Sequence, residues 1–400
     1  METSEFELVP EQLRNHYRRF RVSERILLSG HSHQAWPDCA FDAQTQAWLD
    51  AAAFVDDKWR LAFEKAGRVA KGFADLLGDQ PENIALGANT HELVFRFLSA
   101  LPLRERPKVV TTDHEFHSMW RQLARLAEEG LEIDWVSVEP VETLCDRLIA
   151  TIDHRTAAVM VSAVFFDTAK INPNLGVVCN FARSVGAEMF VDAYHALGVV
   201  DYDLSKHGLN DAYVTGGGYK YLQLGEGNCF LRLPPHCELR PIFTGWFADF
   251  EHRSNLNRNE RVAYGDGGIR FAGATYDPTS HYRGAAVFEF FERQKLTPSV
   301  LRTTSQRQLA LFEQTLVQAD LPTSVFARTH NAPLPQIGGF LTYRSAQAPQ
   351  VVAELRRRNI FCDARGTVVR FGPAPYLSDQ QIQDGALQTA EVVRSLPRSE

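Results

Sequence analysis

The chain has 400 residues, a formal net charge of -7, 44% hydrophobic residues and 23% charged residues. These values are ordinary for a globular protein, so a disordered chain, a collagen and a long coiled coil are poor fits. The charge is modest and no long block of lysine or arginine occurs, so composition does not support a nucleic-acid partner. A chain of this length usually divides into two domains.

The amino terminus, Met1-Glu-Thr-Ser-Glu-Phe-Glu, is acidic and lacks the basic and apolar regions of a signal peptide. No apolar run reaches membrane-spanning length, so we expect no membrane partner and a cytoplasmic location. The cysteines are scattered, without a CxxC pair or a histidine at metal-ligand spacing. We therefore expect neither a disulfide framework nor a metal site.

Apolar β-rich runs alternate with amphipathic helical stretches through the first part of the chain. The expected strands are residues 108–112, 133–137, 157–162, 188–192 and 212–215. Alternation at this spacing predicts an α/β fold with a mostly parallel sheet covered by helices on both faces.

The pattern changes after Pro278. Residues 281–318 predict long helices, and a smaller α+β unit with an antiparallel sheet is expected from segments 338–343, 349–358, 360–362 and 368–371. We predict an N-terminal segment, 1–40, that joins the small domain, a large domain, 41–285, and a small C-terminal domain, 286–400. Without a long Gly/Ser linker the domains should pack tightly, with the ligand site in the cleft between them.

One lysine follows a glycine run directly behind an apolar segment, in Thr215-Gly-Gly-Gly-Tyr219-Lys220-Tyr221. Upstream, Asp192 ends another predicted strand. An enzyme that uses pyridoxal phosphate (PLP) needs this pair, because the cofactor's aldehyde requires an amine and its pyridine nitrogen requires a carboxylate that keeps it protonated. We therefore predict PLP as the cofactor.

A phosphate site is expected where a loop leads into the apolar-periodic run 93–101. Asn89, Thr90 and His91 lie at the start of this helix, with Glu92 in its first turn. Free backbone N–H groups and the helix dipole at such an end suit a phosphate. Taken alone, Thr90 could equally be a simple helix cap.

Aromatic and imidazole rings follow two of the predicted strands. Phe116 comes after strand 108–112, where side chains at the carboxyl edge of a parallel sheet enter the ligand crevice, so it is our candidate for stacking on the pyridine ring. His114 and His117 are possible polar contacts. His195, which follows Asp192, is a candidate cofactor contact. Packing in the core is the alternative for Phe116 and His195.

Two further residues allow a binding or a structural role. Arg370 lies between apolar residues on a predicted strand, where an unpaired guanidinium would be costly, so it meets either a structural or a substrate carboxylate. Trp246 could donate its ring N–H to a ligand or simply pack.

Several motifs together carry a family resemblance. Asp192-Ala-Tyr-His195, Gly217-Gly-Tyr219-Lys220-Tyr221-Leu222 and Gly225-Glu-Gly227 resemble the D-x-x-H, Y-K-Y-L and G-x-G pattern of kynureninases, a branch of the class V, fold-type I PLP enzymes. Glu115-Phe116-His-Ser118 resembles the family's E-F-P-S segment, Thr244-Gly-Trp246 its S-G-W segment, and Val369-Arg370-Phe-Gly372 its R-F-G segment. The resemblance extends over nearly the whole chain.

The resemblance implies a fold-type I architecture, with a seven-stranded-type sheet in the large domain, and assigns further roles. Tyr219 would hold the phosphate and relay protons, and Trp246 would give its N–H to the phosphate. Arg370 and His33 would bind the substrate, with Arg370 clamping the α-carboxylate. Thr275 would reach the phosphate from a neighbouring subunit, which implies a homodimer with composite active sites.

The implied reaction is hydrolysis of the Cβ–Cγ bond of L-kynurenine or 3-hydroxykynurenine, giving anthranilate or 3-hydroxyanthranilate and L-alanine in tryptophan catabolism. Lys220 would remove the α-proton. An aminotransferase or an epimerase remains open, because both use the same lysine, aspartate and arginine. A desulfurase needs a nucleophilic cysteine, and segment 329–336 has none. A non-catalytic protein with this fold is a rival from another class; a dehydrogenase fits less well, since no early G-x-G-x-x-G occurs.

Overall fold

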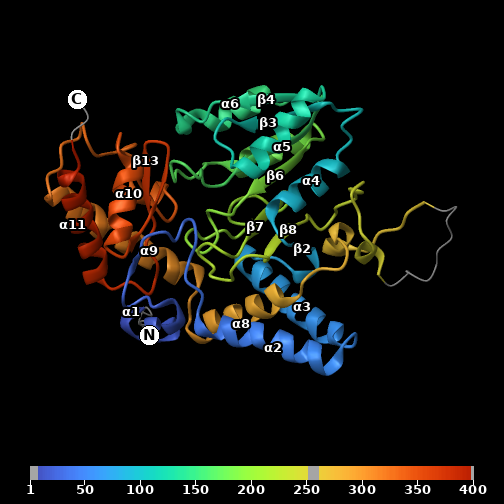
Figure 1. The fold of residues 1–400 in the computed structure, drawn as a ribbon. Helices are drawn as coiled ribbons and strands as arrows, with labels where there is room; N and C mark the ends of the chain where they lie inside the picture. Colours follow the sequence, from blue (N-terminus) through green and yellow to red (C-terminus); the bar gives the residue numbers. More distant parts are fainter. Residues whose placement is uncertain (1–7, 251–260, 398–400) are drawn as a thin grey trace, which may run out of the picture.

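The structure of the protein, a computed structural model, describes residues 8–250 and 261–397 (Figure 1). The acidic first seven residues of the predicted N-terminal segment, and the last three of the predicted small domain, lie outside the described residues. Within the described part of the chain, no helix is both long and apolar enough to cross a bilayer.

A seven-stranded sheet forms the centre of the larger unit. Its strand order is β2-β8-β7-β6-β5-β3-β4. Their bounds are β2 (Ile84–Gly87), β3 (Lys108–Thr112), β4 (Glu132–Val136), β5 (Thr156–Ser162), β6 (Glu188–Asp192), β7 (Tyr213–Gly217) and β8 (Cys229–Arg232). Strand β8 runs antiparallel to both of its neighbours, and the other strands are parallel to one another. The predicted α/β fold with a mostly parallel sheet is confirmed.

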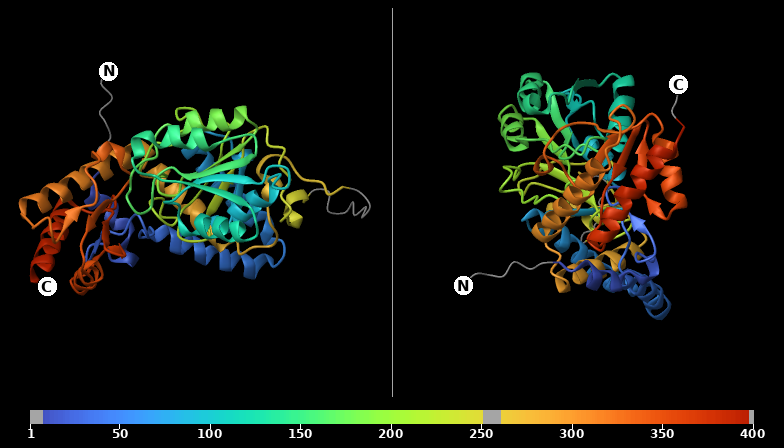
Figure 2. Two further views of the ribbon diagram at one scale, coloured as in Figure 1. Left: turned by 90° about the horizontal axis from the view of Figure 1, so that it is seen from above. Right: turned by 90° about the vertical axis from the view of Figure 1, so that its left-hand side faces the viewer.

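Helices cover both faces of this sheet (Figure 2, left). They are α2 (Asp38–Phe54), α3 (Lys58–Leu77), α4 (Thr90–Ala100), α5 (His117–Glu128), α6 (Leu144–Thr151), α7 (Leu175–Ser184) and α8 (Thr279–Arg293). All seven residues of β5 are buried, as expected of a central parallel strand covered on both sides. Helix α8 packs against α2 and α3.

The C-terminal part forms a smaller unit at one side of the molecule (Figure 1). Its antiparallel sheet has the order β12-β13-β10-β9, as the sequence predicts. The bounds here are α9 (Pro298–Gln318), β9 (Ala327–Arg328), β10 (Leu341–Arg344), α10 (Ala348–Arg357), β11 (Ile360–Phe361), β12 (Asp363–Arg365), β13 (Val368–Phe371) and α11 (Asp379–Ser395). A capping box of Ser378 and Gln381 starts α11.

The N-terminal segment lies against this smaller unit. It carries α1 (Pro10–Leu13) and β1 (Ile26–Leu27), and β1 pairs in parallel with β11. The predicted boundary at 285/286 falls inside α8, a helix that packs on the large unit. The exact domain boundaries stay a prediction.

Candidate active site

The residues predicted to carry the chemistry follow strands of the central sheet. In a parallel sheet the carboxyl ends of the strands meet at one edge, where ligands bind. A cavity of about 180 Å³ lies there. It is lined by Ala88, Asn89, Thr90, His91, Phe116, Ser118, Ser162, Val164, Phe166, Asp192, Tyr194, His195, Tyr219, Lys220, Glu226 and Cys229. Eight of the predicted site residues are in this set, and their functional roles stay predictions.

Lys220 is the only lysine among these lining residues, and its side chain is buried. Its Nζ lies 2.5 Å from Nε2 of His195, and 4.7 Å from the ring centroid of Tyr194. Burial lowers the pKa of Lys220 to about 7, with Asp192 opposing the shift. A substantial fraction of the amine is therefore neutral, and thus nucleophilic and basic, near neutral pH.

The glycine run before Lys220 is required by close packing. A Cβ atom built on Gly217 would come within 2.5 Å of both Sγ of Cys229 and the hydroxyl oxygen of Tyr194. One built on Gly218 would come within 2.4 Å of Leu224. Strand β7 can therefore pass beside these side chains and deliver Tyr219 and Lys220 to the cavity only with glycine at these positions.

His195 and Asp192 reach the same cavity from the end of β6. Burial, reinforced by the charge of Lys220, lowers the pKa of His195 well below its usual value, so the ring is neutral and accepts a hydrogen from Lys220. Its Nδ1 is buried and meets no hydrogen-bond partner among the described residues. Burial raises the pKa of Asp192, whereas the backbone N–H of Tyr194, at 2.9 Å, and the charge of Lys220 lower it.

The N-terminus of α4 forms another wall of the cavity. Asn89 is the N-cap of this helix, and its side-chain oxygen accepts the N–H of Glu92 at 2.8 Å. Thr90 and His91 are the first helical residues and also line the cavity. The positive end of the helix dipole thus lies beside Lys220, in an arrangement suited to an anion.

Two phenylalanines meet edge to face at the cavity. Phe116 is at the N-cap position of α5, and its ring centroid is 5.3 Å from Nζ of Lys220. Phe166 contacts the Phe116 ring at 5.4 Å and an interplanar angle of 82°. His117 also contacts both phenylalanine rings, but neither His117 nor His114 lines the cavity.

Arg370 has a structural carboxylate as its partner. It is buried on β13 and donates from Nε and Nη2 to the two oxygens of Asp363, at 2.8 and 2.5 Å. Its Nη1 donates to the backbone oxygen of Phe166 at 2.5 Å. Of the two roles that the sequence leaves open for Arg370, the structural ion pair is present, and a role in substrate binding stays a proposal.

Three predicted residues lie outside the set that lines the Lys220 cavity. His33 stacks on Tyr219 with ring centroids 5.1 Å apart, and its Nε2 is 3.8 Å from Glu226. Trp246 is 49% exposed and stacks against Phe247. Thr275 lines a second, larger cavity of about 1080 Å³, which shares Ala88 and Glu226 with the first.

Sequence reasoning missed several cavity residues. Ser162 ends β5 and is paired in register with Asp192, so the strand-end rule that found Asp192 could also have found Ser162. Behind Ser162 lies the buried Glu115, which accepts from its hydroxyl at 2.5 Å and from its N–H at 3.1 Å. Burial raises the pKa of Glu115 to about 8. Cys229 lies on the antiparallel β8, for which the sequence carried no signal.

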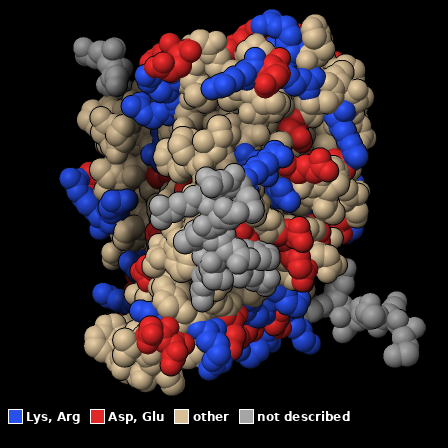
Figure 3. All heavy atoms as spheres, turned by 90° about the vertical axis from the view of Figure 1, so that its right-hand side faces the viewer, with Lys and Arg blue, Asp and Glu red and all other residues tan. Residues whose placement is uncertain are grey.

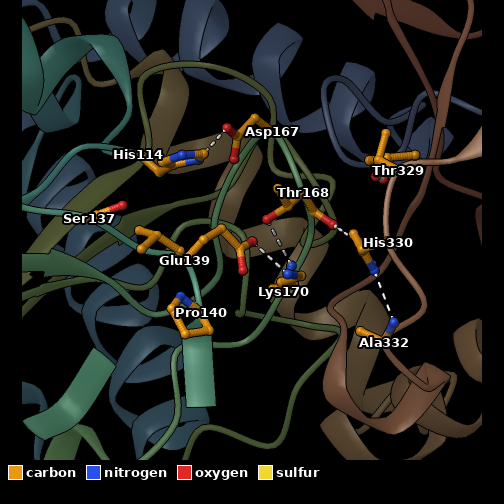
Figure 4. A network of polar contacts seen from close by, with 12 residues as sticks. His114, Ser137, Glu139, Pro140, Asp167, Thr168, Lys170, Thr329, His330 and Ala332 are labelled. Atoms are coloured by element: carbon orange, nitrogen blue, oxygen red, sulfur yellow. Dashed lines mark hydrogen bonds and ion pairs between the residues drawn. The ribbon is translucent and has the colours of Figure 1, made fainter. Parts of the chain in front are cut away.

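A polar network fixes the loop that carries Phe166 (Figure 4). Nδ1 of His114 lies 2.6 Å from Oδ2 of Asp167, and Lys170 pairs with Glu139 at 2.5 Å. From the smaller unit, Nε2 of His330 donates to the backbone oxygen of Thr168 at 2.7 Å. The loop beside the cavity is thus held from both units.

No protein-family model matches the sequence. Over 186 residues, 44% of this chain, the sequence is 30% identical to isopenicillin N epimerase of Streptomyces clavuligerus, and the match spans 45% of that protein. It is 22% identical to the uncharacterized aminotransferase YcbU of Bacillus subtilis over 94% of this chain and 96% of that protein. A mitochondrial cysteine desulfurase of Arthroderma benhamiae is 26% identical over 46% of this chain and 37% of its own length.

Solved structures resemble the whole fold. A mutant of C-DES with glycine linked to its PLP cofactor has a TM-score of 0.80 at 15% identity, covering 94% of this chain and 99% of its own. The apo cysteine desulfurase of Thermococcus onnurineus has a TM-score of 0.78 at 17% identity, with coverage of 98% and 100%. At such identities the similarity establishes the fold. The chain thus has the fold-type I architecture of these structures, and its sequence similarities lie within the class V aminotransferase and cysteine desulfurase-like superfamily, with no similarity specific to kynureninases.

Proposed function

We propose that the protein is a PLP-dependent enzyme of the class V superfamily that acts on an amino acid. The observation that carries the proposal is a buried lysine of lowered pKa, 2.5 Å from a neutral histidine, in one cavity with Asp192 and a helix N-terminus. The similarity to an aminotransferase, an epimerase and cysteine desulfurases supports the same conclusion.

The residues of the cavity fit PLP. Lys220 offers an amine to the aldehyde, the start of α4 suits the phosphate, and Asp192 offers a carboxylate to the pyridine nitrogen. The buried Nδ1 of His195 lacks a partner among the described residues, as expected of a group that a polar ligand would satisfy. Phe116 and His195 offer flat rings to an aromatic cofactor.

The chain's own groups can move the protons that such chemistry needs. When bound, PLP supplies an electron-withdrawing ring that stabilises negative charge at the α-carbon of an amino acid. Lys220, once neutral, accepts the α-proton at Nζ and can return it to the same or a neighbouring atom. Tyr219 lies beside Lys220, and burial raises its pKa to about 12, so its phenol keeps its proton and can donate it.

The choice among reactions is narrowed by the cysteines. Cys229 is the cysteine among the lining residues of the Lys220 cavity, and burial raises its pKa to about 12. Cys362 is also buried, and burial raises its pKa as well. A thiolate nucleophile of the kind a desulfurase needs is not offered by either residue. We therefore favour transamination, epimerisation or C–S bond cleavage without a cysteine nucleophile.

Cleavage of L-kynurenine is the second candidate. It is favoured by the Tyr219-Lys220-Tyr221-Leu222 and Asp192-Ala-Tyr-His195 motifs, and by a cavity that adjoins a much larger apolar one. The comparisons support the superfamily and not this particular reaction.

A homodimer with composite sites belongs to the same proposal. Large apolar side chains are exposed on one helix, where Phe41, Trp48 and Leu49 of α2 are 53%, 73% and 53% exposed. Apolar exposure of this extent is typical of an interface. At the end of the molecule seen in Figure 3, uncharged residues occupy much of the surface, with acidic and basic side chains interspersed among them. The cavity that Thr275 lines adjoins the Lys220 cavity, so a second subunit bound there could add to the site.

The proposal is tested with the purified protein mixed with PLP. We expect an absorbance band of bound cofactor that changes on addition of particular amino acids, and borohydride reduction should fix the cofactor to the peptide that contains Lys220. A panel of amino acids should then be scored for keto acid, inverted amino acid, sulfide and, with L-kynurenine, anthranilate fluorescence. A protein that never binds PLP would refute the proposal, and anthranilate release would establish the second candidate.

A further inference from the structure

Arg370, Asp363 and His31 form a buried charged cluster near the Lys220 cavity. Asp363 on β12 and Arg370 on β13 are direct partners in the register of the antiparallel pair. Both carboxylate oxygens of Asp363 accept from Arg370, and Oδ1 also accepts from Nε2 of His31 at 2.8 Å. Strand pairing and the N-terminal segment thus bring together three residues from distant parts of the chain.

The charges of the cluster are defined by its surroundings. Burial, with the charge of Arg370, lowers the pKa of His31 to about 4, so His31 is neutral and donates its Nε2 hydrogen. Burial tends to raise the pKa of Asp363, but hydrogen bonds from His31 and Arg370 outweigh it and keep the carboxyl ionised. The cluster is one ion pair plus one neutral donor.

His31 is held in place as firmly as its partners. Its side chain is fully buried and stacks on Phe340, with ring centroids 4.8 Å apart and an interplanar angle of 26°. A Cβ atom on Gly372 would lie 2.6 Å from its Nδ1. The imidazole therefore cannot turn away from Asp363 without moving the neighbouring chain.

Asp363 occupies only one edge of the guanidinium. Nε and Nη2 face Asp363, while Nη1 donates to the backbone oxygen of Phe166, whose residue lines the Lys220 cavity. Each Nη carries two hydrogens, and one hydrogen bond from each is accounted for. The remaining hydrogens are the ones that another anion could use.

We propose that Asp363 and His31 are positioning residues, which fix the plane of Arg370 so that its remaining Nη hydrogens bind the carboxylate of an amino-acid substrate. The inference rests on the proposed function, since it requires a substrate with a carboxylate. A free arginine side chain loses rotational freedom when it binds an anion. Asp363 removes that freedom in advance, which strengthens carboxylate binding in particular.

The test uses Asp363→Asn in the PLP-loaded enzyme. Binding of a responsive amino acid and of its decarboxylated amine is measured from the change in cofactor absorbance. We expect Asp363→Asn to weaken binding of the amino acid by about tenfold or more and that of the amine by less than about twofold. His31→Gln should shift the same ratio in the same direction by a smaller factor.

Asp79→Asn is the matched control. Asp79 forms a buried ion pair with Arg232, whose side chain is only 3% exposed like that of Arg370, but neither residue lines the Lys220 cavity. This variant should leave the ratio of amino-acid to amine binding unchanged. Restoring the carboxylate with Asp363→Glu should recover part of the discrimination if position is what matters.

The outcomes separate this inference from the proposed function. An unchanged ratio in Asp363→Asn, or equal weakening of amino acid and amine, would overturn the positioning role while leaving the PLP enzyme intact. If Asp363→Asn does not fold, the ratio in His31→Gln decides the question in the same way. A wild-type protein that binds no PLP would overturn both.

Discussion

Nζ of Lys220 lies 2.5 Å from Nε2 of His195, although one residue follows β7 and the other follows β6. The two strands are parallel neighbours, so their carboxyl ends open into the same cavity. Because His195 is neutral, it can hold the lysine amine without adding a charge beside it. This contact ties the two principal candidate motifs into one site.

The first prediction concerns the anchor of the cofactor. Lys220→Ala should lose the cofactor on dialysis and should incorporate none on borohydride reduction, because no other lysine lines the cavity. Absorbance and peptide mass spectrometry measure both effects. Lys206→Ala, at an exposed lysine paired with Asp201, is the control and should behave like the wild type. Labelling of Lys220→Ala at wild-type levels would contradict the role.

The second prediction follows from the pKa of Lys220, which burial lowers to about 7. The neutral amine is the nucleophile, so the rate of PLP uptake by the cofactor-free protein should rise as the pH increases through about 7 and then level off. Stopped-flow absorbance between pH 5.5 and 9.5 gives the profile. A rate that keeps rising toward the usual lysine pKa of about 10.4 would show that burial does not act in this way.

The third prediction concerns Asp192. Asn at this position keeps the size of the side chain but cannot stabilise a proton on the pyridine nitrogen. Asp192→Asn should therefore still attach PLP to Lys220, while turnover of a responsive amino acid falls by about 10²-fold or more. The absorbance band and the rate are read from the same sample. Unchanged turnover would exclude a role for the carboxylate in catalysis.

The sequence predicted best what depends on local pattern. The apolar runs 108–112 and 188–192 form strands with these same bounds, and the ends of parallel strands converge whatever the details of packing. Asp192 and Lys220 could therefore be assigned to one edge before the structure was known. The glycine run behind Lys220 was equally informative, since only glycine fits there.

Long-range partners could not be predicted in this way. His31 contacts Asp363 across 332 positions of the chain, and no local pattern carries that pairing. The partner of Arg370 depends on the register of β12 and β13, which places Asp363 opposite it. Trp246 and Thr275 were assigned by resemblance alone, and they lie outside the set of residues that line the Lys220 cavity.

The fourth prediction concerns the two histidines that hold the loop of Phe166. The contact with Asp167 raises the pKa of His114, so its stabilising effect is present below the ordinary histidine pKa and is lost as the pH rises through the raised one. Burial lowers the pKa of His330, so its contribution is present above the ordinary pKa and is lost as the pH falls through the lowered one.

Variants at these two histidines should change stability with opposite pH dependence. His114→Gln should lower the melting temperature more at pH 6 than at pH 8.5. For His330→Gln the loss should be larger at pH 8.5 than at pH 5. Scanning calorimetry across this range checks both. Equal shifts at all pH values would mean that neither pair titrates as the contacts indicate.

The last prediction concerns the exposed face of α2. Phe41 and Trp48 are seven residues apart and so lie on the same side of the helix. If a second copy of the chain covers this side, Trp48→Glu should buries a charge in the interface and shift the protein toward the monomer in sedimentation and light scattering. Val317→Glu on α9 is the matched control, because Val317 is 72% exposed against 73% for Trp48. If Trp48→Glu separates the subunits and also weakens PLP binding, the site is composite; a monomeric wild type would exclude the dimer.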